Sequence, residues 1–477
     1  MVLVTLRAMA LGGMRDHIGG GFHRYSVDGN WRVPHFEKML YDQAQLVLAY
    51  LEAAQASGDA FYAEVAADTL AYVERDLTDE GGGFYSAEDA DSVPPEEAHA
   101  DKPHKMEGAF YVWRDEEMTE ILGSDADIFR IRYGVLPDGN APFDPQNEFV
   151  QKNLLYTARG VDEVMSATAK SHDEVEAALV RAREKLLERR STRPRPHLDD
   201  KVLTAWNGLM IAAFARASRV IGDERYVGIA RRAALFIWKH LWKADTQTLL
   251  RRYRRGDSAV DGYAEDYAYL VFGLLELFQA DGDPRWLEWA LMLQRRQDEL
   301  FADPVEGGWF STTGRDESVL LRLKEDYDGA EPSATSVTVV NLLTLSHLTN
   351  DQAFQQAINR ALGLFASRIA QGARTVPMMM AALSAYHAGM SQVVIAGNAG
   401  SAGTRSLMDV LRRRYLPFAI TIPVAPSHAD AIARLLPWVD AIAARTSHPT
   451  AYVCRNFACL TPASSPGELA AQLETES

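Results

Sequence analysis

Hydrophobic residues along the chain follow two kinds of helical pattern. Three segments are apolar on nearly every side at helical spacing: residues 202–217, 269–278 and 337–348. Four others carry a single apolar stripe with the charged residues kept off it: 61–77, 226–242, 286–301 and 354–369. A helix that is apolar all round is buried on both sides, whereas a helix with one stripe faces water. The alternation of the two kinds therefore predicts an inner and an outer layer of helices.

The number of inner helices indicates how the two layers close. We expect inner helices to begin near residues 35, 114, 200, 263, 333 and 377. Six hairpins, each of one inner and one outer helix, close most simply into a ring. The predicted fold class is therefore all-α, an (α/α)6 toroid. An open helical solenoid is the alternative architecture with the same alternation.

The pattern changes twice along the chain. We expect residues 1–390 to form the barrel, with a strand-containing insertion at about 81–160, where the alternation in 109–113 predicts strands that cover one mouth of the ring. After residue 390, short β-branched runs are separated by one helix: 392–396, 407–415 (the helix), 418–424 and 451–454. Residues 391–477 are therefore predicted to be a small C-terminal α/β appendage.

A glycine run near the N-terminus indicates a binding site. Three consecutive glycines at 19–21 lose much backbone entropy on folding and permit close approach of a neighbour. Aromatic and charged residues follow, and from Phe36 onward apolar residues recur at helical spacing. His35, Lys38 and Asp42 are three and four residues apart, so we expect them on one side of the first two turns of this helix.

Composition and charge narrow the classes of partner. Of the 477 residues, 47% are hydrophobic and 24% are charged, as in ordinary soluble proteins. The formal net charge of −16 argues against a nucleic-acid partner or an acidic membrane surface. The basic run at 251–255 is short and isolated, so it does not change this conclusion.

Cysteine content and hydropathy predict a cytoplasmic protein. The two cysteines, Cys454 and Cys459, are too far apart for a C-x-x-C pair, and a reducing compartment is the simplest explanation for so few. No run of about 18 apolar residues is present, which argues against a membrane span. The first eleven residues read as a short helix rather than a signal peptide.

Polar and acidic residues gather just before the expected inner helices in four clusters. They are His35, Glu37, Lys38, Tyr41 and Asp42; Asp199, Asp200, Lys201, Trp206 and Asn207; Asp261, Tyr263, Glu265 and Asp266; and Asp328, Glu331 and Ser333. Helix capping and the helix dipole explain about half of the acids. Because the starts of inner helices converge on one mouth of a ring, the remainder predicts a deep, acidic, aromatic-lined cavity.

Such a lining suits a sugar. Carboxylates and amides hydrogen-bond to hydroxyl groups, and Trp and Tyr faces stack on pyranose rings. Glycoside hydrolysis needs two facing carboxyl groups, one of them protonated. Sugar epimerisation or isomerisation instead needs two bases on opposite faces of an acidic C–H, often histidines. Both reactions stay open.

We assign site residues from their positions at helix starts and on facing loops. Asp200 and Asp266 are expected to be acid/base carboxyl groups, and His35 with Glu37 a second acid/base pair. Expected substrate-binding residues are His23, Arg24, Tyr25, Lys38, Asp42, Glu88, Asp89, Trp206, Asn207, Tyr263, Glu265 and Glu331. Asp89 and Asp91 have a spacing that could hold a cation, but the rest of a calcium loop is missing, so a solvated acidic turn is the preferred interpretation. We assign no metal site, and the turn at 397–400 lacks the full phosphate-loop pattern, so we assign no cofactor.

Several strings of the sequence together resemble one known family. They are Gly19–Tyr25, Trp31–Gln43, Gly82–Ser92, Glu107–Trp113, Asp200–Leu209 and Ala451–Pro462. They resemble the thioredoxin-domain-containing family that includes spermatogenesis-associated protein 20 and its bacterial relatives, over essentially the whole chain. The resemblance implies a body similar to six-hairpin glycosidases and N-acylglucosamine 2-epimerases.

The resemblance implies no reaction, but it suggests a partner. Members of the family usually begin with a thioredoxin-like domain that carries a C-x-x-C motif, and this sequence has neither, so a thioredoxin-like protein is a candidate partner. We expect a carbohydrate-active enzyme, either a glycosidase or a sugar isomerase, that acts on a small sugar ligand. The alternative is a non-catalytic binding scaffold that works with a thioredoxin-like domain. The sequence leaves the oligomeric state open.

Overall fold

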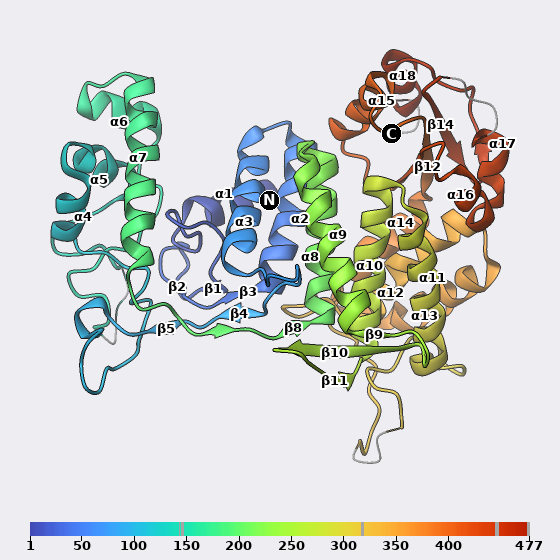
Figure 1. The fold of residues 1–477 in the computed structure, drawn as a ribbon, viewed down its shortest axis with the longest axis horizontal. Coiled ribbons are helices and arrows are strands. Elements are labelled where there is room, and N and C mark those ends of the chain that lie inside the picture. Colours follow the sequence, from blue (N-terminus) through green and yellow to red (C-terminus); the bar gives the residue numbers. More distant parts are fainter. Residues whose placement is uncertain (143, 145–146, 316–318, 444–447, 475–477) are drawn as a thin grey trace. The chain divides into compact units, whose positions relative to one another are not determined.

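The structure is a computed structural model that describes residues 1–142, 144, 147–315, 319–443 and 448–474 (Figure 1). It divides into two compact units, each built from several stretches of chain. The first unit comprises Met1–Tyr50, Glu64–Thr78 and Tyr85–Asp200, and the second comprises Leu51–Ala63, Asp79–Phe84 and Lys201–Ser477. The expected boundary near residue 390 falls inside the second unit, and it stays a prediction.

The first unit combines short strands with helices. Its helices are α1 (Val2–Leu11), η1 (Pro95–Glu97), α4 (Asp115–Leu122), η2 (Gly123–Asp125), α5 (Ala126–Tyr133), α6 (Val161–Thr168) and α7 (His172–Ser191). Its strands are β1 (Tyr25–Ser26), β2 (Pro34–His35), β3 (Lys38–Met39), β4 (Ala87–Glu88), β5 (Asp91–Ser92), β6 (Met106–Glu107) and β7 (Leu198–Asp199). The division passes through α2 (Leu40–Ser57) and α3 (Ala60–Asp76).

Strand pairing delays the start of α2, so the expected helix from Phe36 is wrong in its first turn. Lys38 and Met39 are extended and pair with Glu88 and Ala87 of β4, which pairs in turn with β7. The helix begins at Leu40. His35, Lys38 and Asp42 therefore do not share one face of a helix.

The insertion at 81–160 is more helical than the sequence suggests. The aromatic segment expected as a strand forms a turn at residues 109–111, where the N–H of Tyr111 donates to the carbonyl of Gly108 at 2.8 Å. Trp113 alone makes a strand-like bridge, to Asn153. The expected inner helix near residue 114 is the short α4, whose buried apolar residues are Met118 and Leu122.

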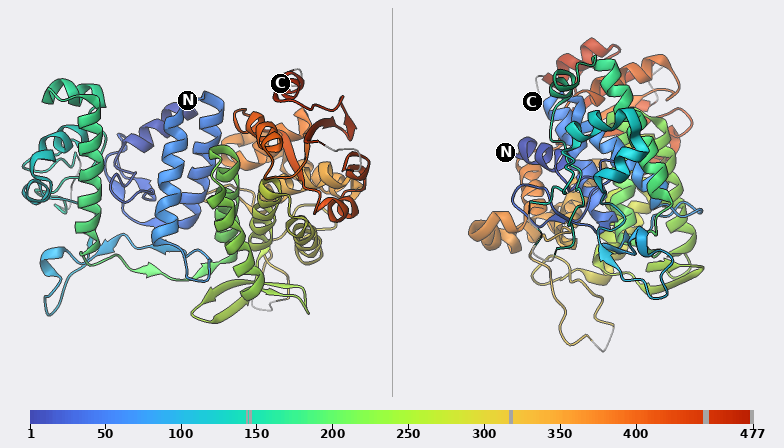
Figure 2. Two further views of the ribbon diagram at one scale, coloured as in Figure 1. Left: turned by 45° about the horizontal axis from the view of Figure 1, so that its top comes forward. Right: turned by 90° about the vertical axis from the view of Figure 1, so that its left-hand side faces the viewer.

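The second unit contains the paired helices. They are α8 (Thr204–Ile221), α9 (Glu224–His240), α10 (Ala264–Asp281), α11 (Pro284–Phe301), α12 (Ala334–Thr349), α13 (Gln352–Gly372), η3 (Ala373–Thr375) and α14 (Pro377–Ala388). Helices α8, α10 and α12 are buried nearly all round, whereas α9, α11 and α13 bury one stripe. Figure 2 shows these hairpins from two further directions. The alternation predicted from the sequence is confirmed, and the fold class is the all-α toroid of paired inner and outer helices.

Two glycines allow the inner helices α8 and α10 to touch. A Cβ atom on Gly208 would lie 2.4 Å from the backbone of Tyr269, and one on Gly273 would lie 2.4 Å from the carbonyl oxygen of Gly208. Real Cβ atoms do not come so close, so only glycine permits this approach. The two helices therefore pack backbone against backbone at these positions.

The second unit also carries a small β-sheet next to the inner helices. Its strands are β8 (Val202–Leu203), β9 (Trp242–Lys243), β10 (Thr248–Arg254) and β11 (Asp257–Asp261), with β10 between β8 and β11. The register places Arg252 opposite Leu203 and Tyr253 opposite Val202. This pairing holds β10 beside the start of α8.

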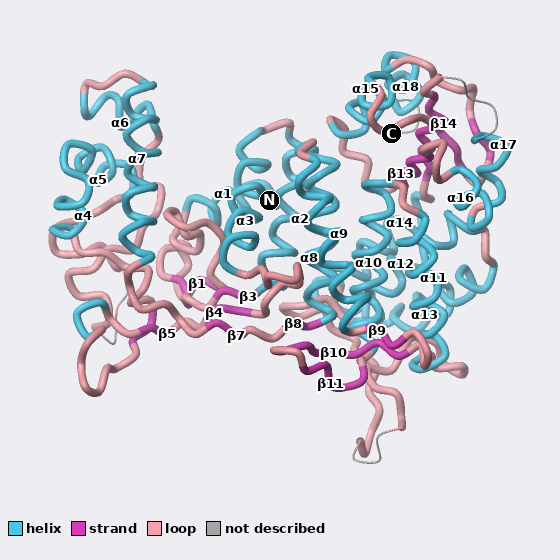
Figure 3. The backbone as a smooth tube through the Cα atoms, in the orientation of Figure 1, coloured by secondary structure: helices cyan, strands magenta, loops and turns pink. Residues whose placement is uncertain are grey.

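The C-terminal part of the second unit is the expected α/β appendage (Figure 3). It contains β12 (Ser391–Ala396), α15 (Ala402–Arg412), β13 (Ala419–Val424), α16 (Ala429–Leu435), η4 (Pro437–Val439), α17 (Asp440–Ala443), β14 (Thr450–Arg455), β15 (Ala458–Cys459) and α18 (Pro466–Glu474). The sheet order is β13-β12-β14-β15, with β12 parallel to β13 and antiparallel to β14. Val393, Leu407 and Leu469 belong to its core.

The two cysteines face each other across the β14–β15 hairpin and form a disulfide. Cysteine content therefore gives no support to a reducing compartment, and the cytoplasmic location stays an expectation. None of the helices in the described residues is long and apolar enough to cross a membrane.

Candidate functional site

The starts of three inner helices come together in the second unit. Trp206 lies in the first turn of α8, Glu265 and Asp266 lie in the first turn of α10, and Glu331 lies three residues before the start of α12. Arg251 of β10 reaches the same place. The sequence predicted that these helix starts would gather polar and aromatic side chains, and within this unit they do.

Asp266 is fully buried and joins two helix starts to β10. Its carboxylate accepts hydrogen bonds from the N–H of Ala205 at 3.1 Å, the N–H of Tyr263 at 2.9 Å and the guanidinium of Arg251 at 2.9 Å. Burial raises the pKa of Asp266 to about 7, although Arg251 acts in the opposite direction. Its side chain is 0% exposed, so it has no surface to offer a substrate.

Glu331 lies against an indole group. The Nε1–H of Trp206 donates to Oε2 of Glu331 at 2.7 Å. Burial, followed by the nearby charge of Glu265, raises the pKa of Glu331 to about 7, while the Trp206 hydrogen bond and Arg251 lower it. A carboxyl group with this pKa exchanges protons at neutral pH.

Arg251 organises the exposed edge of this cluster. Its Nη1 is 2.6 Å from Oε1 of Glu265, and its guanidinium lies 4.7 Å from the centroid of the Tyr263 ring. The side chain of Glu265 is 27% exposed and Tyr263 is 41% exposed. A solvent-borne ligand can therefore reach Glu265, Tyr263 and the guanidinium together.

Asn207 follows Trp206 in α8, and its amide group hydrogen-bonds to the backbone. Its Oδ1 accepts from the N–H of Phe84 at 2.8 Å, and its Nδ2 donates to the carbonyls of Phe84 and Leu203, each at 2.9 Å. The side chain is buried. Its amide fixes the turn that follows the glycines at 81–83.

A second cluster of expected site residues forms in the first unit around His35. Its Nδ1 is 2.7 Å from Oε1 of Glu107, and its Nε2 is 3.7 Å from Oε2 of Glu37. The Tyr25 ring stacks on the imidazole with 4.9 Å between centroids, and Arg24 donates to Glu37 at 2.9 Å. The His35 side chain is 26% exposed, so this is an accessible imidazole between two carboxylates.

Three other expected binding residues of the first unit are buried. His23 hydrogen-bonds through Nδ1 to the carbonyl of Phe36 at 2.9 Å, and burial lowers its pKa to about 3. The ammonium of Lys38 donates to Asp16 and to the carbonyl of Gly20, each at 2.9 Å. Glu88 accepts from Tyr72 and Arg195, each at 2.7 Å.

The remaining expected residues lie outside both clusters. Asp42 is in the first turn of α2, and Asp200 follows β7, both half-buried. Asp89 is 46% exposed and lies 4.0 Å from Lys105. Within the described residues, no group of three or more His, Cys, Asp or Glu side chains is arranged to hold a metal ion.

Sequence reasoning gave no role to two residues that complete these clusters. In the sequence Arg251 is part of a basic run. Its ion pair with Asp266 shows that its side chain reaches α10, whereas Arg252 pairs with Asp257. Glu107 is 72 residues from His35, so no local spacing links them. The alternation of side chains along a strand could have singled out Arg251.

The fold and the cluster at its helix starts define a class: helical toroid proteins with an acidic, aromatic-edged site. No protein-family model matches the chain. Over 98% of its length the chain is similar to spermatogenesis-associated protein 20, a member of the family that its sequence resembles. It is 40% identical to the human protein over 490 residues, and it spans 62% of that relative's length.

Two sugar-converting proteins are more distantly similar. A cellobiose 2-epimerase of Bacteroides fragilis is 21% identical over 169 residues, which cover 34% of this chain and 43% of the epimerase. A solved structure of cellobiose 2-epimerase from Spirochaeta thermophila is 11% identical, with a TM-score of 0.44 and coverage of 78% of this chain and 70% of that one.

Proposed function

We propose that the chain is a carbohydrate-active enzyme that uses carboxyl groups of its second unit for acid and base catalysis. The observation that carries the proposal is Glu331, with a pKa of about 7 and its carboxyl group held by the indole of Trp206. At neutral pH such a group is protonated in part of the molecules and ionised in the rest. It can therefore give a proton to a leaving group or take one from water.

The other members of the cluster have separate roles in this proposal. Glu265, ion-paired with Arg251, is the second carboxyl group, and the rings of Trp206 and Tyr263 are the surfaces on which a sugar stacks. Asp266 is a positioning residue, since its oxygens are bonded to two helix starts and to Arg251. Asn207 has a structural role, because its amide group is hydrogen-bonded to the backbone of Phe84 and Leu203.

In hydrolysis the carboxyl groups of Glu331 and Glu265 act in turn. Protonated Glu331 gives its proton to the glycosidic oxygen as the bond from that oxygen to C1 breaks. Glu265 takes a proton from the water molecule whose oxygen bonds to C1. The products are two free sugars, and the proton that Glu265 holds returns to Glu331 through solvent.

Epimerisation or isomerisation of a sugar is the second candidate, and the His35 cluster of the first unit favours it. Glu107 fixes Nδ1 of His35, which leaves Nε2 to exchange a proton with the carbon next to a sugar carbonyl. The similarity to a cellobiose 2-epimerase supports the same class of substrate.

Product analysis in D2O separates the two reactions. Purified protein is incubated with mono- and disaccharides and sugar phosphates, and the products are followed by NMR. New reducing ends without deuterium at carbon indicate hydrolysis. Deuterium bound to carbon indicates epimerisation or isomerisation.

Matched variants then assign the site. We expect Glu331→Gln to lower kcat by about 100-fold or more, and Glu299→Gln, an exposed acid of the same unit, to leave it unchanged. If instead His35→Gln abolishes deuterium exchange while Glu331→Gln does not, the reaction belongs to the first unit. If no sugar is turned over, yet sugars raise the Tm, the scaffold alternative replaces the enzyme.

A further inference from the structure

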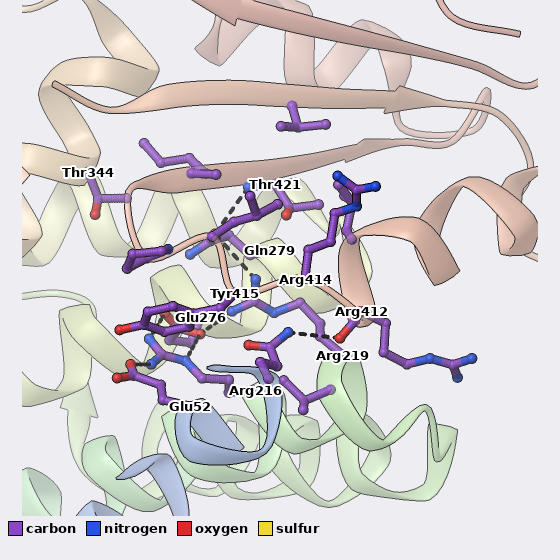
Figure 4. Close-up of a pocket in the computed structure, with 18 of the residues that line it drawn as sticks. Glu52, Arg216, Arg219, Glu276, Gln279, Thr344, Arg412, Arg414, Tyr415 and Thr421 are labelled. Atoms are coloured by element: carbon purple, nitrogen blue, oxygen red, sulfur yellow. Dashed lines mark hydrogen bonds and ion pairs between the residues drawn. The ribbon is translucent and has the colours of Figure 1, made fainter. Parts of the chain in front are cut away.

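The far ends of the inner helices line a polar cavity inside the second unit (Figure 4). Its volume is about 170 Å³, and its walls come from α8, α10 and α12 on one side and from β13 and the chain before it on the other. For comparison, an apolar protein cavity of about 150 Å³ holds a benzene molecule. The cavity therefore has room for a small organic molecule.

This cavity is separate from the cluster at Glu331. Arg219, on its wall, lies in the last turn of α8, whereas Trp206 lies in the first turn. Thirteen residues at 1.5 Å each separate them by about 20 Å along the helix. A ligand in the cavity cannot touch the proposed reaction site.

Two partly buried arginines on the wall share one buried carboxylate. Arg216 pairs with Glu276 through two hydrogen bonds, at 2.7 and 3.1 Å, and with Glu52 at 2.6 Å. Arg219 has Glu276 as its only ion-pair partner among the described residues, and it shares that carboxylate with Arg216. The side chain of Glu52 is 46% exposed, so two guanidinium groups depend on a single buried carboxylate.

The electrostatic consequences appear on both partners. Burial acts to raise the pKa of Glu276, but the two arginines together outweigh it and lower this pKa to about 2, so the carboxylate is ionised at neutral pH. Burial and the neighbouring Arg216 lower the pKa of Arg219, which means that its environment does not fully compensate its charge. Its Nε–H is buried without a hydrogen-bond partner in the described structure, and Nη1 reaches Gln279 only at 3.5 Å.

The rest of the wall adds donors and apolar surface. Arg412, Arg414, Tyr415 and Thr344 also line the cavity, together with apolar residues such as Phe272 and Leu275. Arg219 is largely withdrawn from water, with 19% of its side chain exposed, and a cation in this setting is stabilised by an anion. Guanidinium groups suit carboxylate and phosphate oxygens in particular.

We propose that this cavity binds a small organic anion, a phosphate- or carboxylate-bearing molecule, with the guanidinium of Arg219 as its principal contact. Because its walls come from both the helices and the α/β appendage, the bound anion stabilises the packing of the appendage on the helices. The protein as a whole carries a net charge of −16, so its overall field does not attract anions, and binding depends on this local arrangement.

The test is titration calorimetry of the whole chain in chloride-free buffer with three probes: inorganic phosphate, glucose 6-phosphate and citrate. We expect saturable binding of at least one probe, and which one binds distinguishes the phosphate from the carboxylate source. Arg219→Gln is expected to raise its Kd at least tenfold. In this variant Glu276 keeps Arg216 as its partner, so the buried carboxylate stays paired.

Arg413→Gln is the matched control, because Arg413 is exposed and lies between the two lining residues Arg412 and Arg414. It is expected to leave the Kd within twofold. Equal affinity in wild type and Arg219→Gln, or no saturable binding of any probe, overturns the proposal and leaves ordered water as the occupant.

A measurement on the wild-type chain tests the proposal even if Arg219→Gln does not fold. A crystal of the wild-type chain soaked with selenate is expected to show anomalous density within hydrogen-bond distance of Arg219. Density only at other positions on the surface contradicts the proposal.

Discussion

Asp266 and Glu331 share a raised pKa, but their surroundings differ. Asp266 is fully buried and accepts three hydrogen bonds, so burial acts on a group that cannot meet a ligand. The carboxyl group of Glu331 accepts a hydrogen bond from the indole of Trp206 and lies near the partly exposed Glu265. The same direction of shift therefore marks a structural residue in one case and a candidate catalytic residue in the other.

The raised pKa of Glu331 predicts a pH-dependent stability. Its ordinary value is 4.5 and its folded value is about 7, so between these pH values the folded state keeps a proton that the unfolded chain has released. The stability that this group contributes is complete below pH 4.5 and is lost as the pH rises to about 7. We expect the free energy of unfolding of wild type to fall by about 2–3 kcal/mol relative to Glu331→Gln across this window.

Urea unfolding at intervals between pH 4.5 and 8 measures this difference. Glu299→Gln, which changes an exposed acid, should follow the wild-type curve. Parallel curves for wild type and Glu331→Gln would show that the carboxyl group titrates normally in the folded state.

Asn207 predicts a stability effect without a pH dependence. Asn207→Ala removes the partners of the buried N–H and carbonyl of Phe84, and each such loss costs about 1–3 kcal/mol. We expect a loss of about 2–4 kcal/mol in the free energy of unfolding, measured in urea. Asn359→Ala removes only an exposed hydrogen bond, which the amide oxygen of Asn359 accepts from the Tyr386 hydroxyl, and should cost less than about 0.5 kcal/mol.

At the level of secondary structure, the sequence correctly predicts those helices and strands that depend on residues close together in the chain. The helix layers follow from apolar periodicity, and the helix predicted at residues 202–217 is present from Thr204 onward. The start of α2 is not local, because Lys38 pairs with Glu88 fifty residues later in the chain. The same holds for the site. Helix starts could be placed from the sequence, whereas the contacts of Arg251 with Asp266 and of Glu107 with His35 join separate elements.

The contact between α8 and α10 predicts that replacing glycine with alanine lowers the stability of the protein instead of raising it. Alanine normally stabilises a helix relative to glycine by about 0.5–1 kcal/mol. Gly208→Ala and Gly273→Ala should instead lower stability by about 1–3 kcal/mol each, since the new methyl group meets backbone at 2.4 Å. Thermal unfolding measures the change.

Gly363→Ala in α13 is the matched control. A Cβ atom there meets nothing within 4 Å, so this variant should gain stability. Equal gains at all three positions would mean that the two inner helices are further apart than described.

For the molecule as a whole, the second unit depends on distant stretches of chain. Residues 51–63 and 79–84 belong to it, although most of it begins at Lys201. Phe84 is fully buried and stacks on Phe214 with 5.4 Å between ring centroids. A fragment Lys201–Ser477 therefore lacks part of its own core.

We expect this fragment to lose the cooperative thermal transition of the whole chain and to bind a hydrophobic dye such as ANS. Circular dichroism and dye fluorescence measure both properties. A sharp transition of the fragment at the Tm of the whole chain would show that residues 51–63 and 79–84 are dispensable.

The hydrogen bonds between Phe84 and Asn207 have a consequence for protein synthesis. The two residues are 123 positions apart, and a ribosome adds about 5–20 residues each second. For roughly 6–25 seconds, and longer while Asn207 is still inside the ribosome, the glycine turn and its phenylalanine have no partner. During that interval Phe84 is open to chaperones, so the nascent chain is a more natural client for them than the finished protein.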